Sequence, residues 1–230
     1  MKYLHSVLRF TLIALIVLGS GMLPVPAALA AAPVRPARAP FTTCAAVTEI
    51  PVAECDALVV FYNNNGGAGW LDNTGWLQTD SPCSWVGVSC AAGTNVTGLV
   101  FQKNQVLGSL PVELANLTQL SNLSLPDNWL TGSIPPALGN FAQLTTLDLY
   151  QNGLTGSIPP ELGNLTKLAS LNLGNNELTG PIPPQLGSLA SLTSLNLSST
   201  HPSHRAISPQ PNTRAYRSRH TDQSLRVLST

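Results

Sequence analysis

Two aspartates offer the clearest candidates for acid–base chemistry in this sequence, because paired carboxylates can act as general acid and general base. Asp127 and Asp148 each lie in or just after a segment in which leucines alternate with other residues. If these segments are neighbouring parallel strands, a rise of ~3.3 Å per residue and a spacing of ~4.8 Å place the two residues roughly 11 Å apart. Glycosidases hold their carboxyl groups ~5 to 9.5 Å apart. We therefore expect surface carboxylates; a carbohydrate-active enzyme is the alternative, which Asp→Asn exchanges would test.

Histidine, the usual partner of a nucleophile or a metal, occurs only toward the two ends of the sequence. His5 lies near the N-terminus, and His201, His204 and His220 lie near the C-terminus. The leucine-patterned part between them has no imidazole, which excludes nucleophile–histidine catalysis and histidine-based metal sites there. No phosphate loop, dinucleotide fingerprint or calcium loop is present in the sequence. The sequence predicts a protein that is not an enzyme and that uses no metal or cofactor.

A unit of 24 residues recurs from Val96 onward and accounts for the leucine pattern. It reads L-x-x-L-x-L-x-x-N-x-L-T-G-x-I-P-x-x-L-G-x-L-x-x, as in residues 144–167. Such a period is typical of a solenoid, in which each unit buries its apolar side against its neighbours. The alternating leucines predict one short strand per unit and a continuous parallel sheet on the concave side. The ninth position is expected to satisfy backbone groups of the following turn as a structural ladder of Asn104, Asn128, Asn152 and Asn176.

The L-T-G-x-I-P signature resembles the plant-specific class of leucine-rich repeats found in receptor-like kinases and polygalacturonase-inhibiting proteins. The preceding residues 83–90, CSWVGVSC, are similar to the C-x-W-x-G-V-x-C signature of that family's N-terminal cap. The resemblance covers roughly residues 44 to 199 and extends to bacterial proteins of this type. It implies an α/β-type solenoid: a leucine-rich-repeat right-handed superhelix with a concave parallel β-sheet and a disulfide-stapled N-terminal cap.

All four cysteines lie in the segment that resembles the cap, as expected of disulfides that close the end of an exported solenoid. Four cysteines allow three pairings. The resemblance implies a local loop between Cys83 and Cys90, which leaves Cys44 to pair with Cys55. A zinc site is the weaker alternative, because zinc needs four ligands and no histidine lies nearby. The resemblance also places three aromatic side chains in the cap core: Trp70, Trp76 and Trp85.

The two ends of the chain differ in composition from the repeats. A basic start, a short apolar stretch and the small-residue site at residues 28–30 predict a secretory signal, with an uncleaved anchor as the alternative. After Leu197 the leucine pattern stops, and a segment rich in Ser, Arg, His and Pro predicts a disordered or aberrant tail. The expected organisation is a signal peptide (1–30), a flexible linker (31–43), the cap (44–95), four full repeats plus a partial fifth (96–199) and the tail (200–230).

The cap and repeats together are acidic and sparsely charged, since Lys103 and Lys167 stand against ten acids between residues 41 and 199. This balance argues against nucleic acid and anionic membranes as partners. The resemblance implies a secreted protein that binds a protein, peptide or polysaccharide on its concave face. A structural or adhesive repeat, or a truncated or frame-shifted fragment without function, is the alternative. The candidate partner-binding residues combine aromatic with short polar or charged side chains: Lys103, Asp127, Trp129, Asp148, Tyr150, Gln151, Asn172 and Asn175.

Overall fold

Leucines that recur every 24 residues stack in register and build the core. The computed structural model describes residues 41, 43–91, 94–198, 214–217 and 224–228. In the central row Leu99 pairs with Leu123, and the register continues to Leu147, Leu171 and Leu195 at each following strand. These side chains are 0 to 4% exposed. Complete burial of one leucine contributes about 1.5–3 kcal/mol, so the stacked rows supply the main stabilising term.

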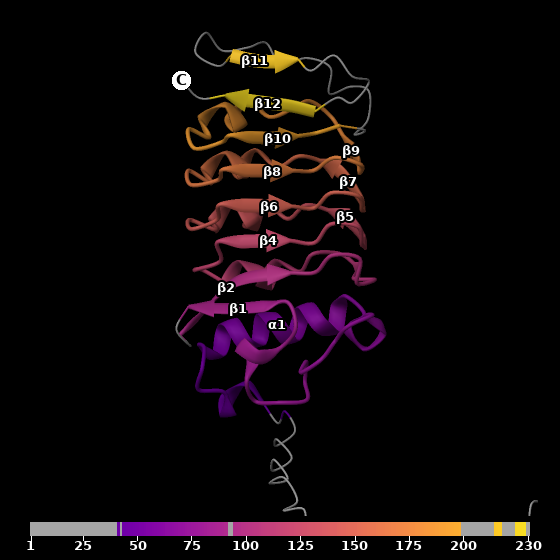
Figure 1. Ribbon diagram of the computed structural model, residues 1–230, viewed down its shortest axis with the longest axis vertical. Helices are drawn as coiled ribbons and strands as arrows, with labels where there is room; N and C mark the ends of the chain where they lie inside the picture. Colours follow the sequence, from indigo (N-terminus) through magenta and orange to yellow (C-terminus); the bar gives the residue numbers. More distant parts are fainter. Residues whose placement is uncertain (1–40, 42, 92–93, 199–213, 218–223, 229–230) are drawn as a thin grey trace, which may run out of the picture. The chain divides into compact units, whose positions relative to one another are not determined.

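The first sheet has eight strands in the order β1-β2-β4-β6-β8-β10-β12-β11, and Figure 1 shows its strands stacked one above the other. From β2 to β10 each strand pairs in parallel with the strand of the next repeat, as the sequence predicts. The bounds are β1 (Val88–Ala91), β2 (Asn95–Val100), β4 (Asn122–Ser124), β6 (Thr146–Asp148), β8 (Ser170–Asn172), β10 (Ser194–Asn196), β11 (Arg214–Arg217) and β12 (Ser224–Leu228).

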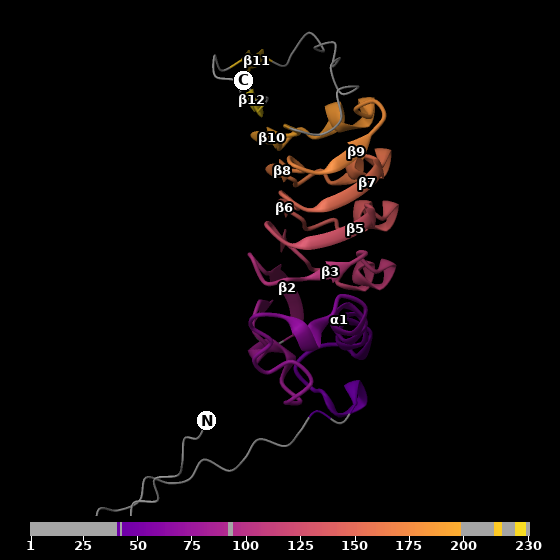
Figure 2. The ribbon, with the colours of Figure 1, turned by 90° about the vertical axis from the view of Figure 1, so that its right-hand side faces the viewer.

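A second parallel sheet, which the sequence analysis did not predict, follows the turn of each repeat. Its order is β3-β5-β7-β9. In Figure 2 the first sheet runs along one side, the 3-10 helices run along the opposite side, and the second sheet lies between them. The bounds are β3 (Leu107–Gly108), β5 (Trp129–Ser133), β7 (Gly153–Ser157) and β9 (Glu177–Thr179).

The convex side carries one short 3-10 helix per repeat. The helices are η4 (Val112–Asn116), η5 (Pro136–Asn140), η6 (Pro160–Asn164) and η7 (Pro184–Ser188). A proline precedes or begins each of them, and its fixed φ suits the start of a helix. Successive helices approach closely: a Cβ built on Gly163 would lie 2.5 Å from the carbonyl oxygen of Gln185 in the next helix. Glycine is therefore required at position 163.

The N-terminal cap is built around α1 (Val52–Asn64), with short 3-10 helices at η1 (Cys44–Ala46), η2 (Gly67–Gly69) and η3 (Pro82–Ser84). The disulfides join Cys44 to Cys55 and Cys83 to Cys90, so the predicted pairing is confirmed. The three cap tryptophans are at most 5% exposed and pack against Phe61 and one another. The leucine-rich-repeat solenoid with a disulfide-stapled cap is thus the observed fold.

A buried carboxylate joins this cap to the first repeat. Glu54 of α1 is 2% exposed, and its Oε2 accepts the backbone N–H of Val96 at 2.6 Å. Its Oε1 accepts from Nδ2 of Asn95 at 2.8 Å. Both oxygens therefore have donors, which offsets the cost of burying the charge.

The end of the solenoid differs in part from the expectation. Most of the segment predicted as a tail lies outside the described residues, as do the predicted signal peptide and almost all of the linker. Two stretches of the tail are strands: β12 pairs antiparallel with β10 through Leu195 and Leu225, and β11 pairs with β12. The expectation of a segment without regular structure is corrected at these stretches. Leu192 and Leu197, in the last unit with the leucine pattern, are only 4% and 6% exposed.

Candidate functional site

The asparagine ladder holds the turns from which the candidate residues project. Nδ2 of Asn176 donates to the carbonyls of Leu149, Leu173 and Gly174 at 2.9–3.2 Å. Its Oδ1 accepts from the N–H of Leu154 at 3.1 Å. Asn128 and Asn152 bond in the same way to their own turns and to the preceding repeat, and Asn104 bonds to Asp72 of the cap. Each turn is therefore fixed to the preceding rung, because buried backbone groups would otherwise lack partners.

The residue before each ladder asparagine has an unusual backbone. Lys103, Asp127, Gln151 and Asn175 have φ angles of 53°, 56°, 52° and 53°, in the left-handed region. This conformation is uncommon for residues other than glycine, and the surrounding hydrogen bonds hold these four residues in it. It places four of the predicted partner-binding residues in one row, at the edge where the concave sheet ends. No sequence signal indicates this strain, because the four residue types differ.

Two further candidates, Asp148 and Asn172, line a hollow of about 260 Å³ on the concave face, formed by residues of β6, β8 and β10. Asp148 and Asn172 stand side by side in the β6–β8 pairing. Oδ1 of Asp148 accepts the backbone N–H of Tyr150 at 3.0 Å. Oη of Tyr150 accepts from Nδ2 of Asn175 at 3.1 Å. The structure therefore brings Asp148, Tyr150, Asn172 and Asn175 together across two neighbouring repeats.

Partial burial raises the pKa of Asp148 above its usual value, and the negative charge of Asp127 adds to the rise. Hydrogen bonds from the backbone of Tyr150 and from the side chain of Asn172 oppose it. Asp148 is thus a hydrogen-bond acceptor that its polar neighbours orient. The carboxylate of Asp127 lies close enough to raise its pKa.

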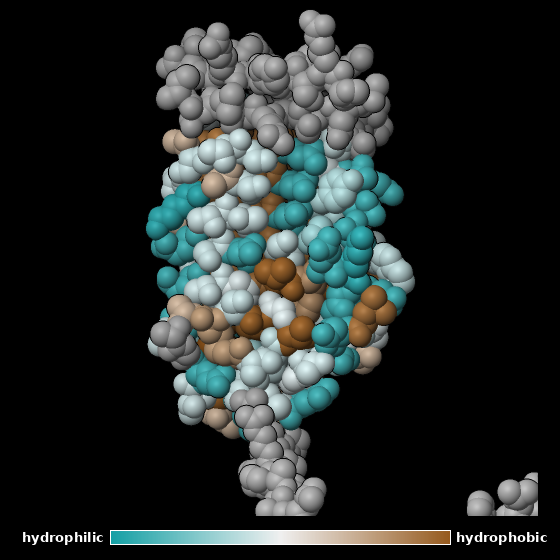
Figure 3. All heavy atoms as spheres, in the orientation of Figure 1, coloured by the Kyte–Doolittle hydropathy of each residue, from teal (hydrophilic) through white to brown (hydrophobic). Residues whose placement is uncertain are grey.

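Gly174 occupies in the next repeat the position that Tyr150 holds. A Cβ on Gly174 would lie 2.8 Å from Nδ2 of Asn196, so a side chain there would displace this amide. The surface over β6, β8 and β10 is white to teal in Figure 3, whereas brown side chains gather near the level of β2. Val100, at the end of β2, is 40% exposed. The concave face thus changes from apolar near the cap to polar toward β10.

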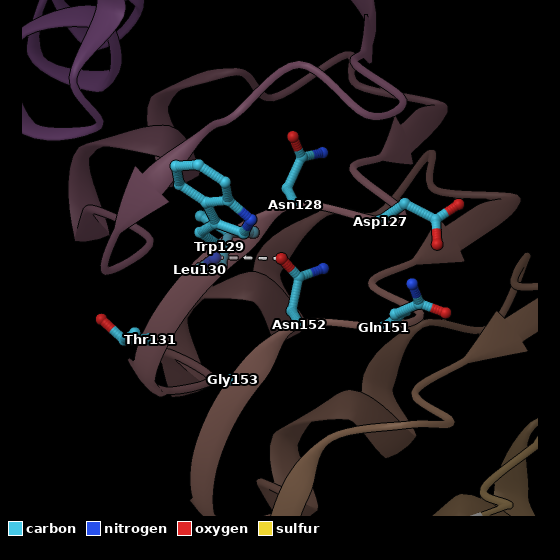
Figure 4. A pocket seen from close by; sticks show the side chains of 8 residues that line it. All are labelled: Asp127, Asn128, Trp129, Leu130, Thr131, Gln151, Asn152 and Gly153. Atoms are coloured by element: carbon cyan, nitrogen blue, oxygen red, sulfur yellow. Dashed lines mark hydrogen bonds between the residues drawn. The ribbon is translucent and has the colours of Figure 1, made fainter. Parts of the chain in front are cut away.

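Trp129 is not on the concave sheet, where the sequence analysis placed it. It is the first residue of β5, in the second sheet, because the chain has already turned at Asn128. Its indole is 61% exposed and lines a hollow of about 440 Å³ with Asp127, Gln151 and Gly153 among others. Figure 4 shows the ring on one side of this hollow and the side chains of Asp127 and Gln151 on the other. Leu107, which pairs with Trp129 in β3–β5, was not among the candidate residues predicted from the sequence.

The described residues contain no cluster of three or more histidine, cysteine or acidic side chains placed to hold a metal ion. Within the same residues, no helix is long and apolar enough to cross a membrane.

Comparison with known proteins agrees with this architecture. The family described as "Leucine rich repeat" matches residues 142–201, and a second model of that description matches residues 119–141. No match was found among curated proteins. The LRR ectodomain of the receptor kinase SOBIR1 from Arabidopsis thaliana is similar, with 27% identity, 66% of this chain and 81% of that chain covered, and a TM-score of 0.56.

Two further similar structures are complexes. The BIR3–SERK2 complex from Arabidopsis thaliana matches with 33% identity, 61% of this chain and 78% of that chain covered, and a TM-score of 0.54. The PEPR1–AtPEP1 complex matches with 32% identity, 63% of this chain but only 21% of that chain covered, and a TM-score of 0.57. The chain belongs to the plant-type leucine-rich-repeat proteins, with an N-terminal cap and repeats similar to receptor kinase ectodomains.

Proposed function

We propose that the protein is secreted and binds a peptide or protein partner on the concave face of its first sheet. The observation that carries this proposal is the group formed by Asp148 and Asn172, which line the hollow over β6, β8 and β10, and by Tyr150, whose hydroxyl is held by Asn175. An aromatic side chain with a polar tip buries a large area at a small entropic cost, and fixed neighbours reduce that cost further. The group therefore suits a partner-binding anchor.

Two kinds of relatives support a protein or peptide partner. Similar structures include BIR3 in complex with SERK2 and PEPR1 in complex with AtPEP1. The predicted signal at residues 1–30 and the two disulfides favour export to an oxidising compartment. In this proposal the carboxylates of Asp127 and Asp148 bind and orient a partner, and the protein performs no reaction.

The test uses the full chain, expressed through an oxidising secretory pathway. A phage library of random dodecapeptides is selected on the wild type, and the dissociation constants of enriched peptides are measured for variants. We expect Tyr150→Ala to weaken binding by about tenfold, the equivalent of ~1.4 kcal/mol. Thr166→Ala, an exposed exchange on the convex side, is the matched control and leaves binding unchanged. Circular dichroism and thermal melts confirm that both variants fold.

Failure to enrich any peptide, or equal affinity of the wild type and the Tyr150→Ala variant, would contradict the proposal. Hydrolysis of a polysaccharide that is lost in both Asp127→Asn and Asp148→Asn would favour the enzyme alternative instead.

A further inference from the structure

One large aromatic side chain is left on the surface of the solenoid. The chain has four tryptophans, and Trp70, Trp76 and Trp85 are buried in the cap with their indole N–H groups bonded to backbone carbonyls. Trp129 is 61% exposed, although its backbone N–H is fixed to the carbonyl of Val106 at 2.8 Å. An exposed tryptophan on a fixed backbone is typical of a binding surface, since tryptophan is enriched among the residues that dominate interface energy.

The repeat itself creates space beside this ring. The tenth position of the unit holds Gln105, Trp129, Gly153 and Glu177 in successive repeats. Gly153 has no side chain, so a hollow of about 440 Å³ opens between the indole and the next repeat. We call it the Trp129 hollow. On the other side of the ring, Leu107 is the direct partner of Trp129 in the β3–β5 pairing and is 43% exposed.

The far wall of the Trp129 hollow is polar and carries a negative charge. Figure 4 shows Asp127 and Gln151 opposite the indole, with Asn128 and Asn152 between them. Within the part of the chain that the structure describes, the side chains of Asp127 and Gln151 have no hydrogen bond or ion pair. Their oxygens are therefore available to a ligand. The charge of the repeats, five acids against two lysines between residues 96 and 199, favours a cation there.

We propose that the Trp129 hollow binds an arginine side chain of the partner. The planar guanidinium stacks on the indole, its aliphatic stem packs along the ring of Trp129, and its charge faces the carboxylate of Asp127. The amide oxygen of Gln151 is a further acceptor for its N–H groups. A neutral sugar could also stack on the ring, but it would gain nothing from the charge of Asp127. This inference rests on the proposed function, because it assigns a chemistry to the partner.

The indole of Trp129 is a natural reporter for the test. The full chain is labelled with ¹⁵N, and the indole N–H signal of Trp129 is identified from its loss in the Trp129→Phe variant. The probes are N-acetylargininamide and its neutral isostere N-acetylcitrullinamide. We expect the arginine compound to shift this signal saturably and the citrulline compound to bind about tenfold more weakly, because the cation–π and charge interactions are lost.

Three variants locate the binding. Asp127→Asn weakens the arginine compound by about tenfold, because a charge-assisted hydrogen bond becomes a neutral one. Gly153→Gln fills the hollow with the residue type that the first repeat carries at this position, and it abolishes the shift. Glu177→Gln removes an acid at the same repeat position outside the hollow and leaves the affinity unchanged.

Equal affinity for the two compounds, or a Trp129 shift by cellohexaose and not by the arginine compound, would overturn this inference. Enriched dodecapeptides that lack basic residues and depend on Tyr150 would also overturn it, while leaving the proposed function intact. If the arginine compound binds in a way that depends on Asp127 but no peptide is selected on the concave face, the proposed function is refuted. The inference of an arginine site in the Trp129 hollow would then still hold.

Discussion

The hydroxyl of Tyr150 accepts a hydrogen bond from the side-chain amide of Asn175 in the next repeat, with 3.1 Å between Oη and Nδ2. This bond fixes the aromatic ring of the proposed anchor before any partner arrives.

A double-mutant cycle measures this relationship. Tyr150→Phe and Asn175→Ala each remove one partner, and we expect a coupling energy of about 0.5–1 kcal/mol in the free energy of unfolding. Chemical denaturation of the wild type, the two single variants and the double variant gives the value. Strictly additive effects would mean that the hydrogen bond contributes nothing to the placement of the ring.

The close approach of the 3-10 helices predicts a position-specific glycine effect. Gly163→Ala places a Cβ 2.5 Å from the carbonyl oxygen of Gln185, so the helices must separate. We expect the free energy of unfolding to fall by ~1–3 kcal/mol. Gly187→Ala is the matched control, because no described atom lies within 4 Å of its Cβ. Its stability should be unchanged or slightly raised, and an equal loss in both variants would refute the packing argument.

The residues with left-handed backbone before each ladder asparagine predict a stabilising substitution. Gln151 has a φ of 52°, which glycine adopts without strain, so Gln151→Gly is expected to raise the free energy of unfolding by ~1 kcal/mol. Gln119 is exposed and is not among the residues with positive φ. Gln119→Gly should therefore lower stability by ~0.5–1 kcal/mol. Urea denaturation of the two variants should show changes of opposite sign; a loss in both would argue against strain at Gln151.

The raised pKa of Asp148 predicts a specific dependence of stability on pH. Since burial raises the pKa in the folded state, the folded protein holds this proton more tightly than the unfolded chain. The wild type should gain stability relative to the D148N variant as pH falls through the folded-state pKa, and the gain is complete below the unfolded value of ~3.9. Denaturation at a series of pH values checks this trend.

Asp127→Asn serves as the control for that series. This exchange removes the charge of Asp127, which adds to the rise in the pKa of Asp148. The pH range in which stability changes should therefore move toward the ordinary pKa of an aspartate. A relative loss of wild-type stability on acidification would contradict the assignment.

The leucine pattern predicted the parallel strands of the first sheet and the ladder, because both depend on residues that recur in register. The cap was predicted from the resemblance of residues 83–90 to the signature of the family's cap. The strand around Leu147 lies one residue earlier than the Leu147–Leu149 pattern suggested, at Thr146–Asp148. The second sheet was missed since its strands alternate over too few residues, as in the short span of Leu107–Gly108, and form only by pairing with the neighbouring repeat.

The candidate site was predicted in composition but not in arrangement. Asp148 and Asn172 follow directly from the alternation of β6 and β8, so both were found. Trp129 was assigned to the wrong sheet because the turn at Asn128 redirects the chain within one residue. Gly153 leaves space for the hollow beside Trp129 because it has no side chain. A consensus pattern does not reveal such a space.

The central claim, that the partner occupies the concave face, is tested most directly by photo-crosslinking within one repeat. A benzophenone side chain replaces Ser170 on the concave sheet or Thr166 on the convex side, and each variant is irradiated with the peptide enriched on the wild type. Our account predicts efficient crosslinking from position 170, lost on competition with unlabelled peptide, and background levels from position 166. Crosslinking from position 166 alone would contradict it.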